Sequence, residues 1–210
     1  MTFRLKIKRA EPNADGLKDG DVPKRAERRR AIIRAAYQTL AEKGFEGLRM
    51  REIAKRAGLN HATLHYYFAG KEALIDGVLD HIVQELSIGR GPGMENLGPR
   101  QRLVAHFEEL IRQARQQPEM FVVLAEINAR SMRDPAVHSV VAKNDRGWKR
   151  FLMEILQEGI RKKEFQAWLD ADTAAEAIIS LVRGLSVTCA GRADAMERPL
   201  RQLAAWLVVK

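Results

Sequence analysis

Two histidines, a threonine and two tyrosines lie close together at residues 60–68 of this 210-residue chain. Imidazole and hydroxyl groups donate and accept hydrogen bonds and aromatic rings stack, so this set is suited to recognising a polar partner. His61 and His65 also have the i, i+4 spacing of two metal ligands. Ala62 stands where the zinc-protease pattern needs Glu, and no carboxylate or third histidine lies nearby in sequence. We therefore expect no metal and no cofactor.

The residues before this stretch predict the helices that must hold it in place. From residue 23, apolar side chains recur at the i, i+3/i+4 spacing of one buried helical face, and Gly44 supplies a stop. A second short helix is expected over residues 50–57. Gly58 then permits a sharp turn, and Asn60 is suited to cap a third helix.

The third helix is expected to display one polar face. At 100° per residue, Leu64 and Phe68 point inward, whereas Thr63, His65 and Tyr66 point outward. So short a helix is unstable alone in water and persists only if the first two helices pin it. This arrangement describes a helix-turn-helix, whose second helix enters the major groove of DNA.

The charge of the chain is concentrated in its first third. Residues 1–71 contain 17 Lys and Arg but 8 Asp and Glu, whereas the remaining residues contain 19 of each kind. This asymmetry indicates an anionic partner, either nucleic acid or a membrane surface. A solvated basic arm is an alternative for the first residues, but not for the charges that continue through helical sequence.

Other features narrow the protein class. The chain is 46% hydrophobic and 30% charged, which is ordinary for a globular protein. No apolar run approaches the roughly 18 residues of a membrane span, and no apolar segment follows the basic start, so we expect a cytoplasmic protein without membrane contact. One cysteine, Cys189, excludes an internal disulfide. No nucleophile–base set is found, so we expect no catalytic residues and no enzyme activity.

Beyond residue 71 the pattern is helical throughout. Helices are predicted over residues 71–87, 100–117, 119–133, 135–162, 172–190 and 195–209, with a glycine-rich loop at 89–99. No alternating segment is long enough to indicate a strand. The fold class is therefore all-α.

Residues 28–80 resemble the DNA-binding domain of the tetracycline-repressor (TetR) family. The family pattern is matched by Gly44-Phe45, Ile53-Ala54, Ala57-Gly58-Leu59, the run 63–68 and Lys71-Glu72-Ala73-Leu74. Pro12, Asn13, Gly16 and Gly20, with mixed charge and no sustained period, indicate a flexible basic arm at 1–22. The resemblance implies a helix-turn-helix domain at 23–71 and an effector-binding and dimerisation domain at 72–210. It implies DNA contacts by Arg49, Arg51, Asn60, His61, Ala62, Thr63, His65, Tyr66, Tyr67 and Lys71.

Two positions depart from the family pattern. Arg49 stands where a Thr or Ser usually caps the second helix, so Glu52 lacks its capping-box partner and that helix start should lose stability. We expect Arg49 to contact phosphate instead. His65 replaces the usual tyrosine, which makes a phosphate contact there sensitive to pH.

The C-terminal helices are expected to form a homodimer. Apolar residues cover nearly the whole circumference of residues 174–190, with Arg183 as the main exception, which indicates burial on two sides. The alternative is that both stripes are buried within a monomer. The predicted dimer interface consists of Ile178, Val182, Leu185, Leu203, Trp206 and Leu207.

The middle helices offer candidates for a ligand pocket among aliphatic residues. Such pockets are mostly apolar, which favours a small lipophilic effector. Plain core is the alternative for these residues, and a solvated carboxylate is the alternative for Glu126. The candidates are His106, Phe107, Phe121, Glu126, Trp148, Phe151, Met153 and Cys189.

The resemblance thus implies a ligand-responsive repressor that binds a palindromic operator as a dimer. A different class remains open, namely a DNA-bound adaptor whose C-terminal domain binds a protein. A structure without a cavity among the middle helices would favour the adaptor.

Overall fold

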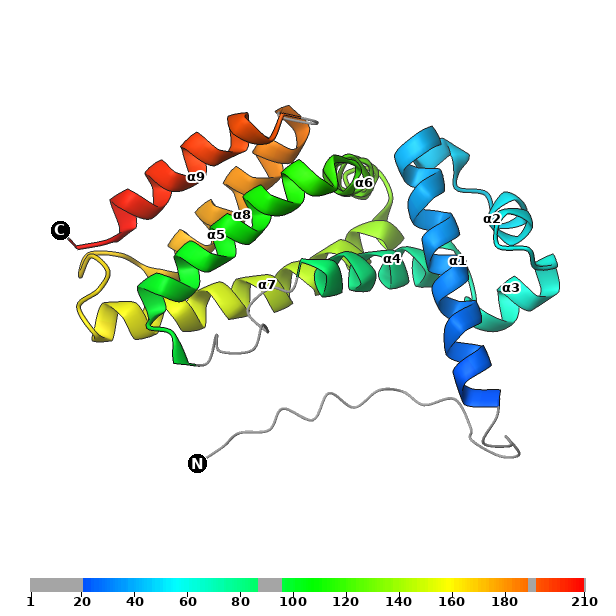
Figure 1. Cartoon of the computed structure of the whole chain (residues 1–210), viewed down its shortest axis with the longest axis horizontal. Helices are drawn as coiled ribbons and strands as arrows, with labels where there is room; N and C mark the ends of the chain where they lie inside the picture. The colour runs from blue at the N-terminus through cyan, green and yellow to red at the C-terminus, as the bar shows by residue number, and fades with distance from the viewer. Residues whose placement is uncertain (1–20, 87–95, 189–191, 210) are drawn as a thin grey trace.

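The computed structural model describes residues 21–86, 96–188 and 192–209. Figure 1 shows a small head, made by the first three helices, beside a larger body made by the last five, with α4 between them. The helices are α1 (Asp21–Lys43), α2 (Met50–Arg56), α3 (His61–Tyr67), α4 (Lys71–Glu85), α5 (Pro99–Gln116), α6 (Pro118–Ser131), α7 (Pro135–Arg161), α8 (Ala171–Thr188) and α9 (Ala193–Leu207), with a 3-10 helix η1 (Phe45–Gly47).

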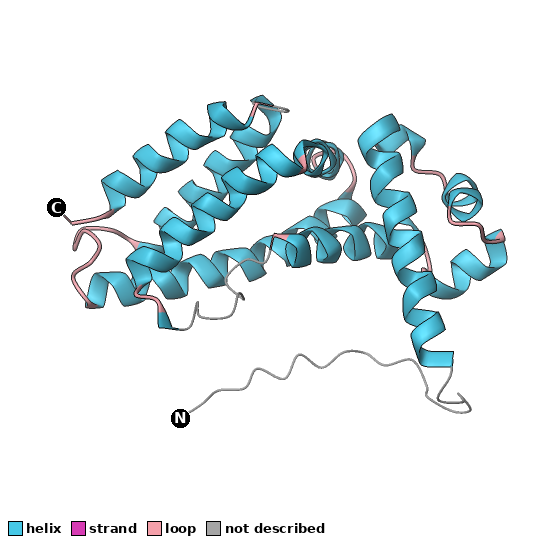
Figure 2. Cartoon of the chain, in the orientation of Figure 1, coloured by secondary structure: helices cyan, strands magenta, loops and turns pink. Residues whose placement is uncertain are grey.

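The predicted all-α fold is confirmed. Within the described ranges the only extended pairing is an isolated bridge between Phe165 and Val208, and Figure 2 shows helices joined by loops. The helices expected from the sequence are present, whereas η1 was not expected. None of the helices in these ranges combines the length and the apolar character that crossing a bilayer requires.

Local signals shape the head. Gly44 and Gly58 have φ angles of 63° and 68°, the left-handed region in which glycine is favoured. The side chain of Asn60 accepts a hydrogen bond from the backbone N–H of Thr63 at 2.7 Å, as expected of an N-cap. Arg49 precedes α2 without a side-chain cap, which confirms that this helix start lacks the usual support.

Two interfaces connect the head to the body. Helix α4 packs against both α1 and α7, and α1 packs against α6. The apolar core is continuous across them, since Ile33 of α1, Ile75 of α4 and Ile127 of α6 belong to one buried cluster. The head therefore packs directly on α4 and α6.

Candidate nucleic-acid interface and ligand pocket

Helix α3 is anchored by its inner face and open on its outer face. Leu64 is fully buried and Phe68, just after the helix, is also buried, whereas the side chain of Tyr66 is 67% exposed. Ala62 and His65 are exposed as well, and Thr63 is half-buried. The outer face therefore presents hydroxyl, imidazole and methyl groups that can contact base edges.

The two histidines of α3 contact each other. Their Nε2 atoms lie 3.2 Å apart, and the ring centroids are 4.4 Å apart in an edge-to-face arrangement. Neither ring is buried. In the part of the chain that the structure describes, no group of three or more His, Cys, Asp or Glu residues is placed to hold a metal ion.

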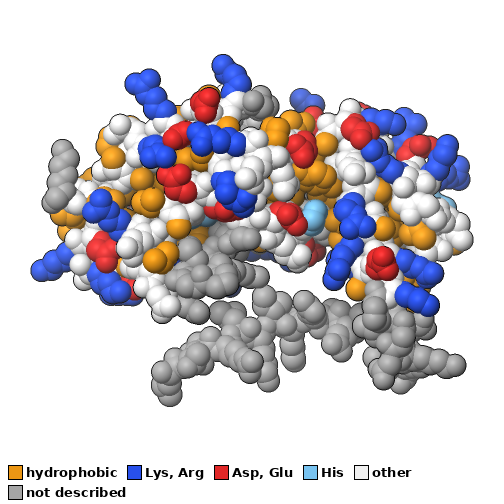
Figure 3. All heavy atoms as spheres, in the orientation of Figure 1, with side chains coloured by type: hydrophobic (Ala, Val, Ile, Leu, Met, Phe, Trp, Pro, Cys, Tyr) orange, Lys and Arg blue, Asp and Glu red, His pale blue; other side chains and the backbone are white. Residues whose placement is uncertain are grey.

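Basic side chains lie near this face, and Figure 3 shows Lys and Arg on the head at the right of the view as well as on the body. The guanidinium of Arg25 lies 5.6 Å from the ring centre of Tyr66. Arg49, Arg51 and Lys55 are exposed on the preceding segment. Exposed cations beside a displayed helix are suited to phosphate contacts.

Two further basic residues have partners within the protein. The guanidinium of Arg56 makes a bidentate pair with the carboxylate of Glu42, which ties α2 to α1. The Lys71 ammonium lies 5.0 Å from the ring centre of Phe45 and the side chain is half-buried, as is Tyr67. Arg56 thus has a structural role, and a phosphate contact by Lys71 competes with its contact to Phe45.

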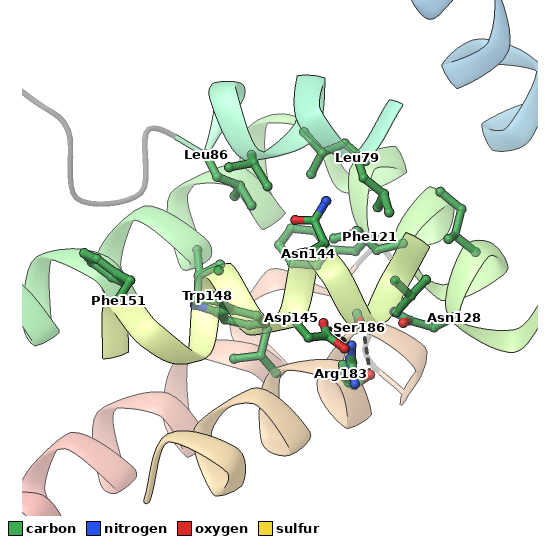
Figure 4. Close-up of a pocket in the computed structure, with 18 residues that line it drawn as sticks. Leu79, Leu86, Phe121, Asn128, Asn144, Asp145, Trp148, Phe151, Arg183 and Ser186 are labelled. Atoms are coloured by element: carbon green, nitrogen blue, oxygen red, sulfur yellow. Dashed lines mark hydrogen bonds and ion pairs between the residues drawn. The ribbon is translucent and has the colours of Figure 1, made fainter. Parts of the chain in front are cut away.

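The body contains a pocket between α4 and α8 with a volume of about 320 Å³ (Figure 4). Most of its wall is aliphatic or aromatic, as is typical of sites for small molecules. The lining residues are Leu79, Ile82, Val83, Leu86, Leu110, Phe121, Leu124, Ile127, Asn128, Val141, Asn144, Asp145, Gly147, Trp148, Phe151, Val182, Arg183 and Ser186.

Three predicted ligand residues, Phe121, Trp148 and Phe151, line this pocket. His106 lies behind the wall, where its Nε2 accepts a hydrogen bond from the Trp148 indole Nε1–H at 3.1 Å. Phe107 is buried in the core, and Met153 is half-buried against it. Cys189 lies outside the described residues.

Glu126 is placed away from the pocket. Its Oε2 accepts a hydrogen bond from the backbone N–H of Phe45 at 2.9 Å, so its carboxylate faces the head. The sequence suggested a ligand anchor because Glu126 follows pocket residues in the chain. On a helix, however, Glu126 points away from its neighbours Leu124 and Ile127, which do line the pocket.

His106 is neutral in this setting. Only 1% of its surface is exposed, and burial lowers its pKa to about 4. An indole N–H can only donate, so the Nε2 of His106 must accept and its proton lies on Nδ1. That buried Nδ1 has no hydrogen-bond partner among the described residues.

Sequence reasoning missed the polar part of the pocket. Asn128, Asn144, Asp145 and Ser186 come from three helices, and no spacing within one helix marks them as a group. The one signal was Arg183, the charged exception in an apolar helix, which forms an ion pair with Asp145.

The predicted dimer residues divide into two sets. Ile178, Val182, Leu185 and Leu207 are buried within this chain. Leu203 is half-buried, and the Trp206 side chain is 66% exposed. Of the predicted interface, Trp206 and part of Leu203 therefore remain accessible on this chain, together with the exposed Val187 of α8.

Comparisons with known proteins agree with this architecture. Residues 32–78 match the family model for bacterial regulatory proteins of the tetR family. Residues 99–208, just over half of the chain, match the model for the C-terminal region of BetI-type transcriptional repressors.

Individual relatives are regulators of the same kind. The chain is 36% identical over 84 residues to the HTH-type transcriptional regulator BetI of Brucella anthropi, a match that spans 37% of this chain and 41% of that relative's length. A TetR-family regulator from Rhodococcus sp. superposes with a TM-score of 0.79 and 23% identity, covering 88% of this chain and 100% of the other. Salmonella enterica GusR superposes with a TM-score of 0.73 and 27% identity, covering 86% and 95%.

The BetI relative is named an HTH-type transcriptional regulator, and the helix-turn-helix is the element that the head of this chain contains. The two family matches cover both parts of the structure, the head with its displayed α3 and the body with its pocket. The chain belongs to the TetR family of DNA-binding transcriptional regulators.

Proposed function

We propose that this regulator is a ligand-responsive repressor that binds a palindromic operator as a homodimer. The observation that carries the proposal is the display of α3. Its inner residue Leu64 is fully buried, its outer residue Tyr66 is exposed, and basic side chains flank it. Such a helix reads base edges in a major groove while the surrounding cations bind phosphates.

The DNA-contacting residues follow from this placement. His61, Ala62, His65 and Tyr66 are exposed on α3 and would face the groove, together with Thr63 and the cap residue Asn60. Arg49 and Arg51 would contact phosphates from the preceding segment. Tyr67 and Lys71, both half-buried, would contact phosphates at the edge of the DNA interface.

Dimerisation would place two copies of α3 in successive major grooves, about 34–36 Å apart. The exposed stripe of α8 and α9 supports a contact between two chains. Val187 and Trp206 are 63% and 66% exposed, and the space outside Gly184 is open enough for close approach of another helix. A two-fold dimer also matches the symmetry of a palindromic operator.

The pocket supports control by a small molecule. Its walls include α4, which continues into the head, and α6, which packs on α1. A ligand that binds one arrangement of these helices more tightly would shift the population toward a head spacing that does not fit the operator. The adaptor alternative expected no such cavity, so the pocket argues against it.

Solved relatives hold very different ligands in this fold. A regulator from Saccharomonospora viridis, 21% identical with a TM-score of 0.72, was solved in complex with choline. FadR of Bacillus subtilis, 20% identical with the same TM-score, was solved in complex with stearoyl-CoA. We propose a small lipophilic effector here on the basis of the pocket lining and not of those ligands.

The test is binding to a short duplex from upstream of the protein's own gene, measured over a series of salt concentrations. Tight, sequence-selective binding that weakens steeply with salt is expected. Tyr66→Ala should weaken binding about tenfold or more at every salt concentration, and Arg51→Ala should lower the slope of log affinity against log salt by about 1.

The matched control is Arg161→Ala, which removes a charge at the end of α7, at the opposite end of the molecule from α3 (Figure 1). It should leave binding unchanged. Unaltered affinity and slope in both head variants would overturn the proposed DNA interface.

A further inference from the structure

We infer that the effector is an uncharged molecule with an apolar body and a hydrogen-bonding head group, and that the Asp145–Arg183 ion pair imposes this selectivity. The inference rests on the proposed function, because it assumes that the pocket between α4 and α8 holds the effector.

Polar side chains gather at one end of the pocket, where Leu79 and Phe121 also lie, and the other end is apolar. In Figure 4, Asp145, Arg183 and Ser186 lie beside one another, with Asn128 at the same end of the pocket. Leu86 and Phe151 lie at the opposite end, with Trp148 between them and the polar group. A ligand that fills this space needs a polar head and an apolar body.

The polar end has no net charge. Among the described lining residues, Asp145 and Arg183 are the charged ones, and an ion pair joins their side chains. Both are only about one-third exposed, at 31% and 37%, so water screens them incompletely. The charge of each side chain is already compensated before a ligand arrives.

A charged ligand would disturb this balance. A carboxylate that approached Arg183 would also approach Asp145, and an ammonium group that approached Asp145 would also approach Arg183. In either case a like charge comes within the distance at which repulsion disfavours ionisation. An ionised head group also loses its hydration on entry without gaining an uncompensated partner.

An uncharged head group finds suitable partners at the same place. The guanidinium of Arg183 has more N–H donors than its pair with Asp145 uses, and that carboxylate has a second oxygen to accept. The amides of Asn128 and Asn144 each offer a donor and an acceptor. The Ser186 hydroxyl donates to the backbone carbonyl of Arg183 at 2.7 Å, so its oxygen is left to accept. Alcohols, amides and ketones match this set.

The size of the pocket limits the ligand. A volume of about 320 Å³ lies at the lower end of the range for small-molecule sites. At roughly 30 Å³ for each heavy atom, the share of one water molecule in the liquid, it holds a ligand of about ten non-hydrogen atoms. Decanol, decanoate and decylammonium, with about eleven or twelve non-hydrogen atoms each, therefore form a series of similar size whose head groups are neutral, negative and positive.

The experiment measures the affinity of the full-length protein for these three compounds by titration calorimetry. All three are used in the same concentration range, below the concentration at which the compounds themselves aggregate. Decanol should bind at least about tenfold more tightly than either ion. Asp145→Asn leaves Arg183 uncompensated and should move the preference to decanoate. Arg183→Gln leaves Asp145 uncompensated and should move the preference to decylammonium.

Two further variants test whether the preference for an uncharged ligand belongs to the Asp145–Arg183 pair and whether the compounds bind in this pocket. Lys149→Gln removes a different pair of contacts between α7 and α8, those of Lys149 with Asp172 and Glu176 at 2.8 and 2.7 Å, and should leave the preference for decanol unchanged. Gly147 lines the pocket and a Cβ there meets no atom within 4 Å, so the larger side chain of Gly147→Leu should weaken binding of all three compounds alike.

The outcomes distinguish the two proposals. If the unaltered protein binds decanoate or decylammonium best, or if the Asp145 and Arg183 variants keep the preference for decanol, the ion pair only joins helices and the inference is overturned while the effector pocket stands. If none of the compounds binds, the lipophilic effector site itself is overturned.

Discussion

The carboxylate of Glu126 in α6 accepts a hydrogen bond from the backbone N–H of Phe45, which is 81 positions away in the chain and begins η1 in the head. The guanidinium of Arg130, one turn further along α6, lies 5.0 Å from the ring centre of Phe45. Other positions of α6, namely Leu124, Ile127 and Asn128, line the pocket. One helix therefore contacts both the pocket and the DNA-reading head.

Glu126→Ala should lower the free energy of unfolding by about 1–3 kcal/mol, because the half-buried N–H of Phe45 loses its acceptor. Urea unfolding followed by circular dichroism measures the change. Glu126→Gln is the control, since its amide oxygen can still accept, and it should recover most of the loss. Equal stability of the alanine variant and the unaltered protein would show that water replaces the carboxylate at no cost.

Asn60→Ala should destabilise α3 by about 1 kcal/mol and weaken operator binding, because the N–H of Thr63 loses its cap. Asn60→Asp separates the two effects. Aspartate caps a helix as well as asparagine, so stability should be retained, but its charge repels phosphate and operator affinity should fall. Thermal unfolding and duplex binding are measured on the same samples, and strong operator binding by the aspartate variant would place residue 60 away from the DNA.

Gly159→Ala should destabilise the protein by about 1–3 kcal/mol through overpacking, because a Cβ at this position would meet the Phe165 ring at 2.1 Å. The same substitution at Gly147 on the same helix meets nothing within 4 Å and should stabilise the helix by about 0.5–1 kcal/mol. Urea midpoints of the two variants should therefore move in opposite directions. A shift of both midpoints in the same direction would contradict the close contact between α7 and Phe165.

Stability should fall as the pH is lowered from 7 to 5, and His106 should account for about 2 kcal/mol of the change. Burial lowers its pKa to about 4, so the folded state binds no proton in this window, whereas an unfolded histidine with a pKa near 6.5 does. The unfolded state therefore gains protons and stability is lost. It is retained above about pH 6.5.

Urea unfolding at pH 7 and pH 5 provides the measurement. His106→Gln removes the titrating group and keeps an acceptor for the Trp148 indole, so its stability should change less between the two pH values. An identical pH dependence in the variant would assign the effect to other groups.

The sequence by itself determined where the α-helices lie and, within the head, where the turns fall, which residue caps α3 and which face of α3 points inward. Gly44 and Gly58 permit backbone angles that other residues avoid, Asn60 caps the helix that follows it, and the apolar spacing selects the inner face of α3. These are local properties, decided by each residue and its neighbours within one or two turns. Their positions could be predicted because each signal lies in nearby residues, although the short α3 still needs packing against the preceding helices to persist.

The tertiary structure decided which faces of the longer helices are covered and by what. The apolar circumference of α8 indicates burial on several sides, but periodicity alone cannot tell whether Ile178 and Val182 meet this chain or another, and here they are buried within it. The pairing of Asp145 with Arg183 and of Glu126 with Phe45 joins positions far apart in the chain. The periodicity of one helix tells which side chains share a face of that helix, but not which other helix covers that face. Such contacts therefore depend on how the helices pack in three dimensions.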